Sequence, residues 1–177
     1  MRQLTFMNCW RQDEYESSSM WRSYTTSSDG VVIRSNIESF IESFEDWDGR
    51  LFISNVAYRD FNTGSPFDLE SMDITALSPY FLKREEFKDE REIRAVLTDY
   101  NDPAMYPVHS VSDVPEPTGE VVRDASVDLN QLIDSIVVHP ESKPYLIKTV
   151  RHILEKHGLD PELVVKSALK SGSGSED

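Results

Sequence analysis

Three charged residues at alternate positions, Glu90, Glu92 and Arg94, form the arrangement in this sequence that is best suited to chemistry. Side chains of a β-strand point to opposite faces in turn, so these three would share one face of a strand. Carboxylates two residues apart lie about 7 Å from each other along a strand, close enough to share a ligand or to alter each other's ionisation. An adjacent arginine can hold one of them as a permanent anion and leave the other to act as a base or a hydrogen-bond acceptor. The alternative is a solvated face with surface ion pairs, which stabilise a fold only weakly.

Four further side chains are candidate ligand contacts: Trp21, Tyr24, Lys83 and Arg84. The two aromatic residues belong to an apolar stripe at helical spacing, which is more often core than binding surface. Tyr24 would stand at the end of that helix, where its hydroxyl can reach a cleft. Lys83 and Arg84 could contact an anion, although exposed helix charges are the default interpretation.

The remaining chemistry-bearing residues follow no catalytic or metal-binding pattern. His139 ends a predicted strand without a second ligand at metal-binding spacing, so no metal site is predicted. The single cysteine, Cys9, lies in an apolar run and is predicted to be a small buried core residue. Neither a phosphate-binding glycine loop nor a serine nucleophile elbow occurs, which argues against nucleotide kinases and common hydrolases.

The charge balance restricts the partners of this protein. The 177 residues include 32 acidic and 18 basic side chains, for a net charge of -14. This makes nucleic acid an unfavourable partner, because binding to phosphates requires clustered lysine and arginine. Self-repulsion of this size is relieved by salt, so we predict a halophilic, archaeal cytoplasm, with an ordinary acidic mesophile protein as the alternative. The sequence contains no long apolar run and no secretory leader, so a soluble, cytoplasmic protein without membrane contact is expected.

Apolar periodicity and turn residues predict an α+β fold, with a mixed, largely antiparallel sheet of about five or six strands and flanking helices. We expect one globular domain over residues 1–170 and a flexible polar tail over 171–177. Asp13 and Ser35 are the expected caps of the first two helices. The predicted strands cover residues 2–10, 31–34, 51–58 (a central strand), 90–99, 120–129, 135–139 and, as an edge strand, 162–169. The predicted helices cover 14–24, 36–44, 79–88 and 144–157, and irregular loops cover 61–78 and 100–118.

One set of residues, in its order and spacing, resembles the prokaryotic domain-of-unknown-function 2971 family. The set comprises Cys9, Trp10, Glu16, Ser17, Met20, Trp21, Tyr24, Gly30, Val31, Val56, Tyr58, Lys83, Arg84, Phe87, Glu90, Glu92 and Arg94. The resemblance covers about residues 4–169. It implies a member that lacks the family's usual N-terminal portion, and it implies no established activity.

Three functions therefore stay open: an uncharacterised domain with an acidic Glu-x-Glu-x-Arg strand, an enzyme, or a non-catalytic interaction domain. The enzyme alternative is that the acidic pair is similar to that of ADP-ribosyltransferases, which use NAD; another nucleotide-processing enzyme is a related possibility. In the transferase, Glu92 would bind the ribose of NAD and stabilise an oxocarbenium-like transition state, Glu90 would orient the acceptor, and Tyr24 or Trp21 would stack on nicotinamide. In the interaction domain, ion pairs of Glu90, Glu92 and Arg94 would tie a helix to the sheet. The cofactor and the oligomeric state stay open.

Overall fold

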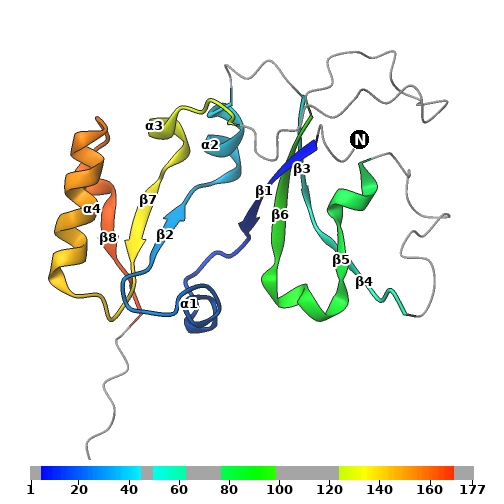
Figure 1. Cartoon of the computed structure of the whole chain (residues 1–177), viewed down its shortest axis with the longest axis horizontal. Helices are drawn as coiled ribbons and strands as arrows, with labels where there is room; N and C mark the ends of the chain where they lie inside the picture. Colours follow the sequence, from blue (N-terminus) through cyan, green and yellow to red (C-terminus); the bar gives the residue numbers. More distant parts are fainter. Residues whose placement is uncertain (1–4, 45–49, 63–76, 99–123, 170–177) are drawn as a thin grey trace, which may run out of the picture. The chain divides into compact units, whose positions relative to one another are not determined.

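A computed structural model describes residues 5–44, 50–62, 77–98 and 124–169 (Figure 1). Contacts along the chain divide it into two compact units. Unit 1 comprises Met1–Asp13 and Asp48–Asp124, and unit 2 comprises Glu14–Trp47 and Ala125–Asp177. The expected single domain over residues 1–170 stays a prediction, because this division concerns contacts and not independent folding.

Unit 1 is built around strand β6 (Glu92–Thr98), which pairs antiparallel with β1 (Thr5–Arg11) on one side and with β3 (Arg50–Asn55) on the other. The central place of β6 explains its burial, because both its hydrogen-bonding edges and both its faces are covered from Arg94 to Thr98. The predicted central strand at 51–58 is therefore an edge strand, and it is interrupted at Val56. The rest of it forms β4 (Ala57–Arg59).

A second, two-stranded sheet in unit 1 joins β4 in parallel to β5 (Leu82–Arg84). Two 3-10 turns flank β5, η2 (Ser78–Phe81) and η3 (Glu85–Glu90). The predicted helix over 79–88 is wrong, because pairing with β4 and burial of Leu82 draw the middle of this segment into a strand. Arg91 then adopts a left-handed conformation with φ of 47°, so β6 begins at Glu92 rather than at Glu90.

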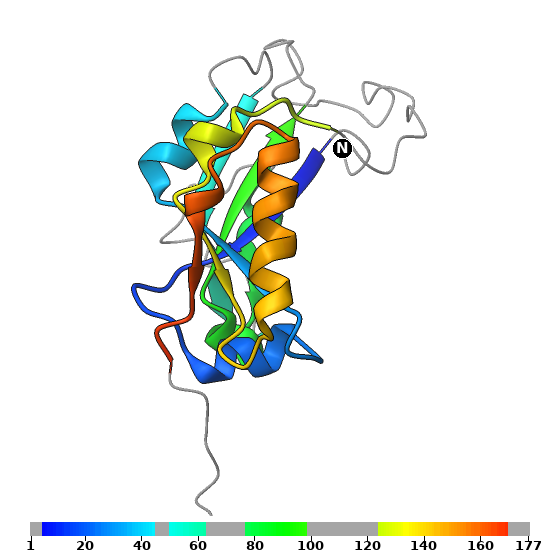
Figure 2. The same cartoon turned by 90° about the vertical axis from the view of Figure 1, so that its left-hand side faces the viewer.

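Unit 2 contains a three-stranded sheet with β7 (Ser135–Val138) at its centre. Strand β2 (Val31–Arg34) is antiparallel to β7, and β8 (Val164–Lys166) is parallel to it. Helix α4 (Pro144–Lys156) packs over β7 and β8 and is followed by the turn η6 (Pro161–Leu163) (Figure 2). Their shared core comprises Ile133, Ile136, Val138, Leu146, Leu154, Leu159 and Val164. Gly158 ends α4 at φ of 73°, which confirms its predicted capping role.

Three short helices complete unit 2: α1 (Ser18–Tyr24), α2 (Ile37–Glu42) and α3 (Leu129–Leu132). The predicted caps are wrong by a few residues. The Ser17 hydroxyl accepts from the amide of Met20 at 3.1 Å, and the Asn36 side chain accepts from the amide of Ser39 at 2.9 Å. Helix α2 buries only Phe40 of its predicted apolar stripe.

The α+β class is confirmed, with strands distributed over three small, mostly antiparallel sheets. The strand predicted over 120–129 is wrong where the chain is described, since residues 124–128 form no strand and α3 follows. Strand β8 lies at a sheet edge, as expected. The expected tail and most of both expected loops fall outside the described residues. No helix in the described ranges is long and apolar enough to cross a membrane.

Candidate functional site

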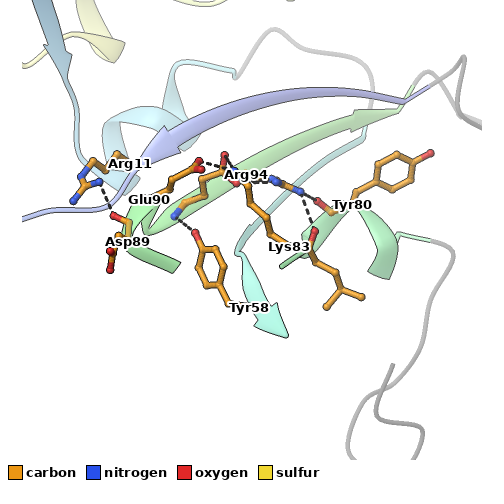
Figure 3. A network of polar contacts seen from close by, with 9 residues as sticks. Arg11, Tyr58, Tyr80, Lys83, Asp89, Glu90 and Arg94 are labelled. Atoms are coloured by element: carbon orange, nitrogen blue, oxygen red, sulfur yellow. Dashed lines mark hydrogen bonds and ion pairs between the residues drawn. The ribbon is translucent and has the colours of Figure 1, made fainter. Parts of the chain in front are cut away.

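Four charged side chains form one connected cluster in unit 1: Lys83, Glu90, Glu92 and Arg94 (Figure 3). Glu92 lies at its centre. Its Oε2 accepts from Arg94 Nη2 at 2.7 Å and Nε at 3.0 Å, and its Oε1 lies 3.4 Å from Lys83 Nζ. The same ammonium donates to Glu90 Oε2 at 2.5 Å. Acidic and basic side chains thus alternate along this series of contacts, so the formal charges of the four-residue cluster cancel.

The local structure explains why these residues meet. Glu92 and Arg94 share a face of β6, as their spacing predicts. Glu90 does not share that strand face, which corrects the expected three-residue alternation. It closes η3, and the left-handed Arg91 turns the chain between it and β6. Glu90 joins the cluster only through Lys83, which β5 supplies.

The guanidinium of Arg94 is held from two sides. Besides the two bonds to Glu92, its Nη1 donates to the carbonyl of Tyr80 at 2.6 Å and approaches that of Leu82 at 3.5 Å. The Tyr58 hydroxyl accepts from the amide of Glu92 at 2.9 Å. Site reasoning from the sequence missed Tyr58, although this residue belongs to the family-like set that includes the acidic residues. The two bonds from Arg94 hold the Glu92 carboxyl group in one orientation.

Lys83 remains an ammonium ion at neutral pH. Burial lowers the pKa of Lys83, but the hydrogen bond to Glu90 and the charges of Glu92 and Glu90 outweigh this effect, so the pKa lies above its ordinary value. Its stabilising effect is present below the pKa of lysine in the unfolded chain and is lost only as the pH rises through the higher folded-state value. The ammonium also lies 5.1 Å from the centre of the Phe87 ring. Lys83 is thus a hydrogen-bond donor and not a neutral amine nucleophile at neutral pH.

A second group of contacts joins the end of β1 to the turn that precedes β6. Asp13 lies between two arginines: Oδ1 is 2.6 Å from Arg91 Nη1, and Oδ2 contacts Arg11 Nε. Arg11 Nη1 also donates to the carbonyl of Asp89 at 2.7 Å (Figure 3). Asp13 therefore fastens the end of β1 to the η3–β6 turn instead of capping a helix.

Cys9 is exposed on β1, opposite Arg94 in the sheet, so its prediction as a buried core residue is wrong. The reason is that β1 is an edge strand among the described strands of this sheet. Partial burial of the sulfur and the charge of Glu92 raise the pKa of the Cys9 thiol, while Arg94 and Lys83 lower it less. The thiol is therefore protonated at neutral pH.

Removing the charge of Glu92 should make Cys9 more reactive. In Glu92→Gln, the thiolate loses a repelling charge and Arg94 is freed to pair with it, so the pKa of Cys9 should fall. The pH profile of alkylation by iodoacetamide should then shift to lower pH, with faster modification at pH 8. Glu85→Gln, in an exposed part of η3, should leave the profile unchanged. An unchanged or upward-shifted profile in Glu92→Gln would show that Glu92 does not act on the thiol.

Residues 20–95 match the family model described as Protein of unknown function (DUF2971). This match is consistent with membership of the DUF2971 family. The DUF2971 segment runs from α1 to Ala95 in β6 and contains the whole Lys83–Arg94 cluster, which confirms the resemblance predicted from the residues. The family carries no assigned activity, and a missing N-terminal portion stays a prediction. No curated protein and no solved structure matches the chain.

The two aromatic candidates of the DUF2971 segment, Trp21 and Tyr24, belong to unit 2. Trp21 is 2% exposed; its ring meets that of His139 edge to face at 5.0 Å, and its Nε1 lies 3.4 Å from Glu16 Oε2. Tyr24 is 60% exposed and has surface to offer a ligand. Among the predicted ligand contacts, only Lys83 is joined to the acidic residues, since Arg84 is exposed at the end of β5. Roles for Trp21 and Tyr24 in stacking stay predictions.

His139 follows β7 directly and is partly buried. Besides the ring contact with Trp21, its Nδ1 accepts from the amide of Glu141 at 3.2 Å. Within the described ranges, no group of three or more histidine, cysteine, aspartate or glutamate side chains is placed to hold a metal ion.

Proposed function

We propose that the Lys83–Glu90 edge of the cluster binds the ribose of a nucleotide, on a frame formed by Glu92 and Arg94. The observation that carries this proposal is a gradient of exposure along connected charges. The side chains of Arg94 and Glu92 are 11% and 12% exposed, whereas those of Lys83 and Glu90 are 22% and 32% exposed. The inner pair is thus fixed and the outer pair is accessible.

The chemistry of the outer pair suits a vicinal diol. An ionised carboxylate only accepts hydrogen bonds and an ammonium only donates them, whereas each hydroxyl of a ribose can do both. The four charges cancel, so the cluster as a whole neither attracts nor repels a net charge. A neutral polyhydroxyl group is therefore a better match for this edge than a lone anion or cation.

The same contacts favour binding over proton transfer. Lys83 is protonated at neutral pH, and Glu92 is bonded to a guanidinium through one oxygen and to an ammonium through the other. A general base needs an accessible acceptor with a pKa close to the working pH. The proposal therefore assigns ligand binding to this cluster, within a DUF2971 domain whose wider function is not established.

An ADP-ribosyltransferase-like activity on NAD is the second candidate. It is favoured by Glu92, whose carboxyl group is held in one orientation on a strand, with Glu90 two residues before it. A ribose contact that stabilises developing positive charge requires such a positioned carboxylate. Neutralisation of Glu92 by Arg94 weakens this reading, because a paired anion stabilises a cation less. The bonds from Arg94 to two backbone carbonyls also support the third candidate, an interaction domain in which the cluster serves only to hold η2 and β5 to β6.

Calorimetric titration with NAD tests these candidates. It should be run in molar KCl, since the net charge of -14 supports the proposal of a halophilic cytoplasmic protein. We expect heat of binding with the wild type and about a tenfold weaker affinity for Glu90→Gln, which loses a charged acceptor. Glu85→Gln, a charge change at the start of the same turn, should bind like the wild type.

The outcomes separate the candidates. Release of nicotinamide by the wild type, abolished in Glu92→Gln, would establish the transferase. Binding without release would support the binding module. The absence of heat with both NAD and adenosine would end both proposals in favour of the interaction domain.

A further inference from the structure

Two arginines lie side by side on the small parallel sheet of unit 1. Arg59 ends β4 and Arg84 ends β5, and the two are direct partners in the register of these strands. Adjacent strands are about 5 Å apart, so both side chains leave the same face of the sheet from neighbouring positions. Both residues are exposed.

In the described part of the chain, neither of these guanidinium groups has a carboxylate partner. Among the described residues, the Arg59 side chain donates only to the carbonyl of its neighbour Tyr58, at 3.2 Å. By contrast, Arg91 and Arg94 of the same unit each contact a carboxylate. Within the described residues, Arg59 and Arg84 thus lack a carboxylate partner although the protein has 32 acidic residues against 18 basic ones.

Like charges directly opposite each other on adjacent strands destabilise a sheet. The pairing of Arg59 with Arg84 therefore weakens a ladder of only three residue pairs, and no contact described for either side chain offsets this effect. A bound anion would remove the repulsion. The arrangement thus has a physical explanation if the pair is a binding site.

We infer that Arg59 and Arg84 bind the phosphate of a small phosphorylated ligand. A carboxylate carries one charge and is satisfied by the fork of one arginine, whereas a phosphate monoester or pyrophosphate carries about two or more charges and offers oxygens to two forks. The site is separate from the ribose-binding edge proposed above. Side chains alternate along a strand, so Arg59 and Arg84 leave the face opposite to Tyr58 and Lys83.

Titration with pyrophosphate, followed by calorimetry, tests this inference. Pyrophosphate contains no ribose, so the result is independent of the proposed function. The titration should be run at the lowest KCl concentration at which circular dichroism shows a folded chain, because salt screens the contact. We expect binding by the wild type despite its net negative charge. In Arg59→Gln/Arg84→Gln, the affinity for pyrophosphate should fall by about tenfold or more.

A matched control removes the same charge elsewhere. Arg22→Gln/Lys148→Gln changes two exposed positions of unit 2 and should bind pyrophosphate as the wild type does. The melting temperature of Arg59→Gln/Arg84→Gln should equal or exceed that of the wild type, since the repulsion is gone, so that lost binding cannot be attributed to unfolding. Absence of binding by the wild type, or equal weakening in the control, would overturn the inference.

Discussion

Replacement of Arg94 by leucine is expected to lower the free energy of unfolding by about 3 kcal/mol. The substitution leaves the carboxylate of Glu92 with a single cation, Lys83 at 3.4 Å, in a place where the Glu92 side chain is 12% exposed. It also removes the donor from the carbonyls of Tyr80 and Leu82. A buried charge without its partner is costly, whereas the intact pair contributes little by itself. Urea denaturation in molar KCl measures the change.

Two further variants show whether the unpaired charge is the cause. In Arg94→Leu/Glu92→Leu, both members of the pair are apolar, and we expect most of the lost stability to return. Lys88→Leu breaks an exposed pair with Glu85, whose separation is 3.8 Å, and should change stability by about 0.5 kcal/mol or less. A double variant as unstable as Arg94→Leu alone would mean that the carbonyl contacts of Arg94, and not the charge of Glu92, dominate.

The Lys83–Arg94 cluster joins structural and binding chemistry in one set of residues. Arg94 connects η2, β5 and β6 through its four bonds, and Lys83 connects β5 to η3 and β6. A ligand that competes for Lys83 or Glu90 would therefore act on the elements that the cluster holds together. Inner members should respond to substitution mainly in stability, and outer members mainly in ligand affinity, which makes the two roles separable.

Local periodicity was sufficient to predict part of the site. The alternation of Glu92 and Arg94 around the apolar residues of β6 requires only that side chains of a strand alternate. Val31–Arg34 and the end of α4 at Gly158 were likewise predictable from turn residues. These features depend on neighbours in the sequence.

The other parts of the site depend on long-range pairing. The predicted helix over 79–88 fails because β5 pairs with β4, more than twenty residues earlier in the chain, and no local pattern of Leu82–Arg84 reveals this partner. The largely apolar run that contains Cys9 predicts a core position, but Cys9 is exposed because β1 lies at an edge. The place of a strand within its sheet is a property of the whole fold.

Replacement of Gly30 by alanine is expected to destabilise unit 2 by about 2 kcal/mol, through overpacking. A methyl group at this position would overlap Cγ2 of Thr25 and lie 3.2 Å from its Cβ and 3.6 Å from the ring of Trp21. Thr25 cannot turn away freely, because its hydroxyl donates to the carbonyl of Trp21 at 2.7 Å. The backbone at Gly30 is also held, since its carbonyl accepts from the amide of His139 at 3.0 Å.

A second-site change tests this steric explanation. Thr25→Ser removes the overlapping methyl group and keeps the hydroxyl, so Gly30→Ala should cost less than half as much stability in that background. Gly158→Ala is the matched control. A Cβ added at position 158 would meet open space, but the backbone there has a φ of 73°. The loss of stability in Gly158→Ala, about 1 kcal/mol, therefore comes from the backbone and should be the same with either residue at position 25. Urea denaturation of the four combinations gives the coupling energy, and a Gly30→Ala cost that is independent of Thr25 would refute the close packing of Gly30 against α1.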